Sequence, residues 1–201
     1  MDRRQLESAG ANYPHIHMHM LGLYGVPAGL LWFLIGLFNL AKPSAEFWIL
    51  GGGALLCLAA WAGVFLYYQR NFGRVTPARS GQVRYSRAAG ACCAVFVAAD
   101  VLGIAVLGRH APVSVMAAGW ALGMLVFYAA VAGLRAHHIV IWGSLLVAGL
   151  LPIWGGADVD AVACLAIGAA TIASGLFDHR ILVRTFRSYQ DLNLEDSNAG
   201  T

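Results

Sequence analysis

Long apolar stretches alternate with short polar ones along the whole chain. Six apolar segments have 19 to 24 residues each, close to the roughly 20 residues that cross a ~30 Å hydrocarbon core at 1.5 Å per residue. The segments do not alternate between apolar and polar residues, as the strands of a membrane barrel would. Since a backbone in lipid must satisfy its own hydrogen bonds, each segment is predicted to be a transmembrane helix. The segments are Met20–Ala41, Phe47–Tyr68, Ala88–Gly108, Ala111–Leu134, Ile139–Ala157 and Val159–Phe177.

The polar connections predict how these helices pair. Lys42–Glu46, Arg109–His110 and Asp158 are too short to separate the helices that they join. Helices joined by short loops pack as antiparallel neighbours. We therefore expect three antiparallel hairpins, with the longest loop, Gln69–Arg87, as the hinge after the first one.

The same pattern predicts three regions. A polar lead covers residues 1–19, a six-helix transmembrane domain covers residues 20–177, and a polar tail covers residues 178–201. In the tail, apolar residues interleave with arginines. This pattern suits either a continuation of the last helix beyond the membrane or a short helix on the membrane surface.

Composition supports the membrane class. The chain is 59% hydrophobic and 11% charged, whereas an average globular domain is about 25% charged. So few charges exclude an ordinary soluble domain, and the apolar and aromatic content excludes a disordered chain. The fold class expected is an all-α, polytopic integral membrane protein.

The basic residues predict the orientation. If the N-terminus is cytoplasmic, 11 of the 13 Lys and Arg residues fall on the cytoplasmic side, and only Lys42 and Arg109 lie outside. Short loops rich in Lys and Arg stay inside, so both termini are expected in the cytoplasm, in a membrane of the bacterial inner-membrane type. The arginines are explained by topology, and the net charge of +3 gives no reason to expect a nucleic-acid partner.

Two glycine pairs stand at the spacing that lets helices approach closely. Gly25 and Gly29 form one pair, and Gly119 and Gly123 form the other. Small residues four apart are common where transmembrane helices pack. They indicate either packing within one bundle or docking onto another membrane subunit or a second copy of the chain.

Asp100 is an unusual residue in the middle of the third span. It lies about 18 Å from the cytoplasmic end of that helix at 1.5 Å per residue. A charged side chain at this depth costs roughly 2.5–3.5 kcal/mol, so it should face the bundle interior and have a partner. The indole N–H of Trp120 is predicted at a similar depth. Asp100 is therefore a neutral hydrogen-bonding group, a proton or cation site in a transport path, or a ligand contact.

Histidines gather at the predicted cytoplasmic face. Histidine is a frequent metal ligand and titrates near neutral pH, so this set indicates a metal or haem site, an interfacial belt or a pH sensor. We expect the rings to converge near Asp178-His179. The candidate metal ligands are His15, His17, His19, His137, His138 and His179.

No motif identifies a catalytic activity. The sequence has no GxxxxGK[ST] loop and no CxxC pair, and it favours a non-enzymatic protein without deciding the matter. The leading expectation is a membrane subunit or scaffold that packs against partner membrane proteins. The alternatives are a small transporter or ligand-binding subunit that uses Asp100, and a metal- or haem-binding redox protein that uses the histidines.

Overall fold

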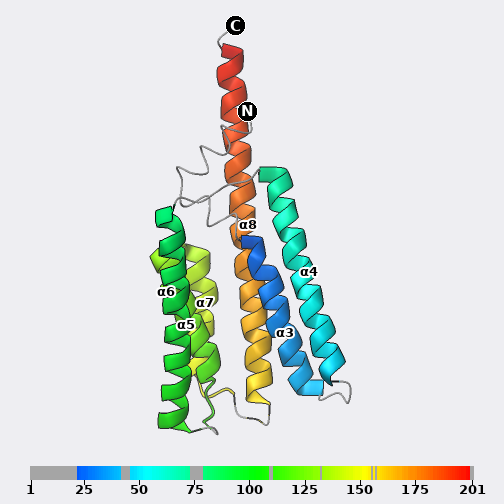
Figure 1. Ribbon diagram of the computed structural model, residues 1–201. Helices are drawn as coiled ribbons and strands as arrows, with labels where there is room; N and C mark the ends of the chain where they lie inside the picture. Colours follow the sequence, from blue (N-terminus) through cyan, green and yellow to red (C-terminus); the bar gives the residue numbers. More distant parts are fainter. Residues whose placement is uncertain are drawn as a thin grey trace.

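The computed structural model describes residues 22–41, 46–72, 79–108, 111–131, 133–154, 156 and 158–199. Over these residues the regular structure is entirely helical, which confirms the all-α prediction. Figure 1 shows the arrangement. The elements are η1 (Gly22–Tyr24), α3 (Gly25–Ala41), α4 (Glu46–Phe72), α5 (Arg79–Leu107), α6 (Val115–Val131), α7 (Ala136–Leu150) and α8 (Val159–Ala199).

Four of the helical stretches are long and apolar enough to cross a membrane: Gly22–Ala41, Gly51–Asn71, Gln82–Leu107 and Val159–Arg184. Helices α6 and α7 are apolar but shorter. Large apolar side chains point outward, and Val106, for example, is 79% exposed. An extensive apolar exterior is unfavourable in water but suits lipid, so the fold is compatible with insertion into a membrane.

The helices form two groups that meet at α8. Helix α8 packs most extensively against α3, which also contacts α4, while α5 packs on α6 and α6 on α7. Helix α8 then touches both α6 and α7, and Figure 1 shows it between the two sets. We call α3, α4 and α8 the first group and α5, α6 and α7 the second group.

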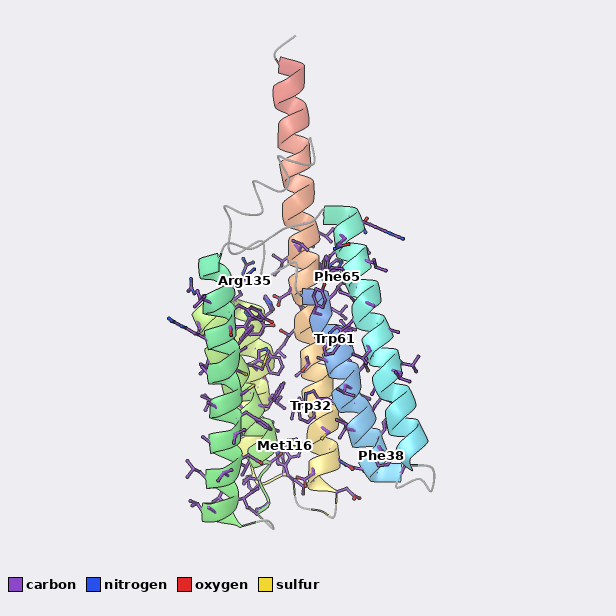
Figure 2. All side chains as sticks on the ribbon, viewed as in Figure 1. Trp32, Phe38, Trp61, Phe65, Met116 and Arg135 are labelled. Atoms are coloured by element: carbon purple, nitrogen blue, oxygen red, sulfur yellow. The ribbon has the colours of Figure 1, made fainter. Side chains whose placement is uncertain are left out.

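An apolar core joins the two groups. Its buried residues include Trp142 of α7 and Ile167 of α8, both fully buried. Trp32 of α3 and Met116 of α6 pack against this core from the two groups and are labelled in Figure 2. In a bilayer, van der Waals contacts of this kind contribute to helix association.

Glycines set the distance between α3 and α8. A Cβ atom on Gly29 would lie 2.7 Å from the Gly168 carbonyl oxygen, and one on Gly25 would lie 3.3 Å from the Thr171 carbonyl oxygen. These contacts leave no room for a larger residue at Gly29. The first predicted glycine pair therefore lies at a helix interface within this chain.

The second glycine pair lies between α6 and α5. A Cβ on Gly119 would stand 3.0 Å from Ala99 Cβ, and one on Gly123 would stand 2.9 Å from the Cys92 carbonyl oxygen. Both pairs thus bring together helices of the same chain.

Glycine, serine and proline mark the ends of three helices. Helix α5 ends before Gly108, whose φ of +76° suits glycine. Ser114 precedes α6, and its Oγ accepts a hydrogen bond from the Ala117 N–H at 3.2 Å, as an N-cap does. Leu151, just before Pro152, is extended and closes α7.

The predicted bounds were wrong at three places. Helix α7 begins at Ala136 and ends at Leu150, so it is shifted from the predicted Ile139–Ala157, because Pro152 stops it early. Helix α5 begins at Arg79, so the second half of the predicted loop Gln69–Arg87 is helical. Hydropathy marks only the apolar part of a helix, whereas Arg and Gln also favour helix and extend it.

The third difference is α6, which covers only Val115–Val131 of the predicted Ala111–Leu134. The tail follows one of the two predicted alternatives. Helix α8 runs without interruption from Val159 to Ala199, so the predicted division between residues 177 and 178 falls within one helix. Of the two alternatives for the tail, the structure has the continuation of the last helix.

We predict that Gly29→Ala lowers stability by about 1–3 kcal/mol, because its Cβ would overlap Gly168 and Ile172. Gly63→Ala is the matched control: nothing lies within 4 Å of its Cβ, and alanine in a helix is up to about 1 kcal/mol more favourable than glycine. Thermal unfolding in mild detergent measures both. Equal stability of the two variants would contradict the close approach of α3 and α8.

Candidate functional site

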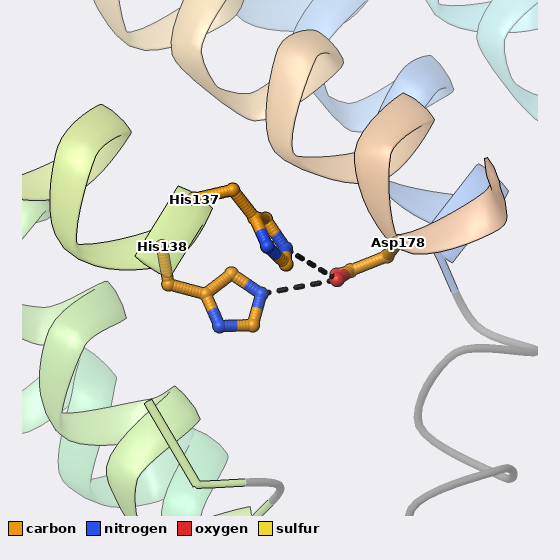
Figure 3. A group of neighbouring side chains, drawn as sticks. All are labelled: His137, His138 and Asp178. Atoms are coloured by element: carbon orange, nitrogen blue, oxygen red, sulfur yellow. Dashed lines mark hydrogen bonds and ion pairs between the residues drawn. The ribbon is translucent and has the colours of Figure 1, made fainter. Parts of the chain in front are cut away.

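Two histidines and an aspartate meet where α7 begins. His137 and His138 lie in the first turn of α7, and Asp178 lies on α8, which passes beside it (Figure 3). The Nε2 atom of His137 is 2.9 Å from Asp178 Oδ1, and that of His138 is 3.0 Å from the same oxygen. The side chains are 14%, 1% and 4% exposed for His137, His138 and Asp178. The three residues form a buried polar cluster between the two groups of helices.

Helix α6 completes this cluster with Tyr128. The hydroxyl of Tyr128 donates to Asp178 Oδ2 at 3.2 Å and lies 3.0 Å from Ser174 Oγ. Its ring stacks on that of His138, with the ring centroids 3.7 Å apart. A hydroxyl has one proton to donate, so Tyr128 gives it to Asp178 and accepts from Ser174. Three donors thus share one buried carboxylate. A carboxylate that is removed from water needs such hydrogen bonds, because burial without them is unfavourable.

The backbone fixes the tautomer of His138. The N–H of Arg135, the residue before α7, donates to His138 Nδ1 at 3.4 Å. An imidazole nitrogen that accepts a hydrogen bond carries no proton, so the proton of a neutral ring sits on the other nitrogen. His138 therefore holds its proton on Nε2 and donates it to Asp178.

The cluster has residue types that can bind a metal ion. The ligating atoms of His137, His138 and Asp178 all lie within 4.8 Å of one another, near enough for one ion to touch all three. A metal-bound histidine, however, uses one nitrogen for the ion and donates the N–H of the other to an acceptor. At His138 the second nitrogen faces a donor instead. The geometry therefore favours a hydrogen-bonded proton site over a metal centre.

A cavity of about 480 Å³ opens beside the cluster, and Asp178 and Tyr128 form part of its wall. We call this cavity the chamber. Residues of every helix from α3 to α8 line it, and most of its wall is apolar or aromatic. The aromatic residues of the wall, apart from Tyr128, are Tyr24, Trp61, Tyr85, Trp120, Phe127 and Trp142.

His179 lies apart from the cluster. Its Nδ1 is 3.3 Å from the Tyr68 hydroxyl of α4, and its ring also contacts Tyr67. Neighbouring residues on a helix point about 100° apart, because a turn takes 3.6 residues. Asp178 therefore faces α6 and α7 while His179 faces α4. His15, His17 and His19 lie outside the described residues.

The predicted pair Asp100 and Trp120 is not hydrogen bonded. The Trp120 Nε1 atom is buried and finds no acceptor in the part of the chain that the structure describes. Its ring packs instead on Trp32 and Phe96. Asp100 is half-buried and lines a second cavity of about 710 Å³, together with the aspartates Asp158 and Asp160.

Tyr128 and Ser174 were missed as site residues by the sequence analysis. Ser174 and Asp178 are four residues apart and so lie on one face of α8, which was a usable signal. Tyr128 had none, because a tyrosine near the end of an apolar helix is common at membrane interfaces.

Comparison with protein-family models, with curated proteins and with solved structures finds no match for this chain.

The tautomer of His138 is directly measurable. We predict that ¹⁵N NMR of histidine-labelled protein, assigned by comparison with His138→Gln, finds Nε2 protonated and Nδ1 unprotonated. A ring with its proton on Nδ1 and Nε2 free would contradict the hydrogen-bond scheme and restore the metal interpretation.

Removal of the shared carboxylate should destabilise the fold. Asp178→Leu leaves His137, His138 and Tyr128 without the acceptor that they share, and a buried donor left without an acceptor typically costs about 1–3 kcal/mol. Asp160→Leu is the control on the same helix, because Asp160 is exposed. Unfolding in mild detergent is the measurement. A loss at Asp178 no larger than at Asp160 would show that the cluster does not hold the helices together.

Proposed function

We propose that this protein is a six-span integral membrane protein that binds a small apolar molecule in the chamber, as a ligand-binding or transport subunit. The observation that carries the proposal is that Asp178, with its three hydrogen-bond donors, forms part of the wall of an apolar cavity. Ionisable residues inside a membrane are costly and mark substrate paths or proton relays. Here the His137–His138–Asp178 cluster is the proton-holding group of the site.

Six spans require that α6 and α7 cross as well as the four longer helices. With 17 and 15 residues they are about 26 and 22 Å long at 1.5 Å per residue. The non-helical segments next to them add the remaining length. Two bonds pair backbone groups of these segments: Ser114 N–H donates to Gly149 O, and Trp154 N–H donates to Pro112 O. Irregular backbone is tolerated at membrane depth where its polar groups find partners.

The expectation of a scaffold that docks on partner subunits stays a prediction. It depended on small-residue faces left free for another protein. Gly25 and Gly29 contact α8, and Gly119 and Gly123 contact α5, so these faces are already used. The ligand-binding alternative is supported by Asp178, which lines the chamber and takes the role first given to Asp100.

The cluster offers a route for protons. His137 is the more exposed of the two histidines, and Asp178 reaches the chamber wall. A proton taken up at His137 passes to Asp178 along their hydrogen bond, and Tyr128 and Ser174 continue the network. Protonation of the cluster and occupancy of the chamber are therefore coupled, because Asp178, which holds the proton, also forms part of the chamber wall.

The proposal is tested by filling the chamber. Ala89 lines it, whereas Ala98, also on α5, is exposed and lies outside it. Ala89→Phe should weaken saturable binding of 2,3-dimethylnaphthalene by at least about tenfold, and Ala98→Phe should not. Calorimetry in mild detergent measures the binding, and the heat of partitioning into protein-free micelles is subtracted. Identical binding by both variants, or none by the wild type, would contradict a ligand-binding chamber.

Topology is tested separately. In a protein whose native cysteines are replaced, Ser80→Cys should react with an impermeant thiol reagent only after permeabilisation, because the distribution of basic residues favours a cytoplasmic start of α5. Labelling in intact cells would reverse the proposed orientation.

A further inference from the structure

We infer that the chamber takes a neutral, flat, apolar molecule that carries carbonyl oxygens, which is the chemistry of a membrane quinone. The inference rests on the proposed ligand-binding function and names the class of ligand. It depends on three features of the chamber wall: its aromatic surface, two buried indole N–H groups without acceptors, and the absence of basic residues.

The wall suits a flat ring. Tyr24 and Trp61 come from the first group of helices, and Trp120, Phe127 and Trp142 come from the second. Aromatic side chains from both sides offer faces and edges on which another ring packs. At about 480 Å³ the cavity is within the range of small-molecule sites.

Two of the three indoles in this wall have N–H groups that are not used. Trp142 is fully buried, and neither its Nε1 nor that of Trp120 has an acceptor in the described parts of the chain. Trp61 differs, because its Nε1 donates to the Tyr24 carbonyl oxygen at 2.9 Å. An indole is a donor only, and a buried donor without an acceptor is unfavourable. A ligand that relieves this must bring hydrogen-bond acceptors and must shift the rings, since neither Nε1 atom is exposed in the structure.

The charges around the chamber favour a neutral ligand. None of the lining residues in the described part of the chain is Lys or Arg, so an anion would have no counter-charge there. The one carboxylate, Asp178, already accepts from Tyr128, His137 and His138, so a cation would have to displace donors. Carbonyl oxygens accept from indole N–H groups and carry no charge. They therefore supply the acceptors that the indoles need and keep the ligand neutral.

The chamber also has an opening that suits a lipid-soluble molecule. Its wall includes Trp61 of α4 and the exposed residues Tyr85 and Cys93 of α5. All three residues lie in helices that are long and apolar enough to cross a membrane, so this part of the wall suits access from the bilayer. A quinone dissolved in the membrane reaches the indoles without crossing water.

Three probes of nearly the same shape test the ligand class. They are 2,3-dimethyl-1,4-naphthoquinone, in which the methyl groups block addition of thiols, its carbonyl-free counterpart 2,3-dimethylnaphthalene, and the cation 1,2,3-trimethylquinolinium. We expect the full-length wild type to bind the quinone at least about tenfold more tightly than the hydrocarbon, which is about 1.4 kcal/mol. The cation should bind most weakly. Binding is measured by calorimetry in mild detergent.

Variants assign the preference to the indoles. Trp142→Phe and Trp120→Phe remove the two unused N–H groups, and each should lower the ratio of quinone to hydrocarbon affinity severalfold. Trp61→Phe is the matched control, because its N–H is already bonded within the protein, and it should leave the ratio unchanged. Since the ratio compares two probes on the same variant, a change in cavity shape largely cancels. If one Trp variant fails to fold, the other variant and the order of the three probe affinities in the wild type still test the ligand class.

The outcomes separate the two proposals. Equal binding of quinone and hydrocarbon, with both lost in Ala89→Phe, would overturn the carbonyl class while leaving the ligand-binding function in place. Tightest binding of the quinolinium would also overturn it and would assign a cation to Asp178. Binding that Ala89→Phe leaves unchanged would overturn the ligand-binding function itself.

Discussion

The carboxylate of Asp178 is the interaction on which the junction between the two groups of helices depends. It accepts hydrogen bonds from two histidines of α7 and a tyrosine of α6, while its own helix is held against α3 by glycine contacts. Elsewhere α8 meets the second group through apolar packing, which has little directional preference. In a membrane, where lipid tails are as apolar as the side chains, such packing is a weak source of specificity. The polar cluster therefore sets how the two groups are aligned.

The chamber follows from the same arrangement. Close approach of α3 and α8 is possible because Gly22, Gly25 and Gly29 have no side chains. Helices α5 and α6 pack just as closely on each other through Gly119 and Gly123. The two tight pairs meet across bulky indoles and phenols, which cannot fill the space between them as completely, and a cavity remains with Asp178 in its wall. The polar cluster and the apolar cavity thus adjoin at Asp178.

Sequence alone predicted the helical class, and it located the apolar part of each helix, because apolar length is a strong signal. It misplaced the bounds of α7, where Pro152 overrides hydropathy, and it missed the polar residues that begin α5, because hydropathy marks only the apolar part of a helix. It also selected His137 and His138 but assigned His179 to the same set. Only the helix rotation separates Asp178, which faces α6 and α7, from His179, which faces α4. The role of Tyr128 depends on a contact between residues 50 positions apart, which a single sequence does not reveal.

The central claim is that Asp178 and the histidines of α7 stabilise the junction jointly. A double-mutant cycle with Asp178→Asn, His138→Gln and the double variant measures this directly from free energies of unfolding in mild detergent. Residues in one hydrogen-bonded network typically show an interaction energy of about 0.5–3 kcal/mol, and we predict a value above about 1 kcal/mol for this pair. Additive effects, with an interaction energy below about 0.3 kcal/mol, would contradict the account.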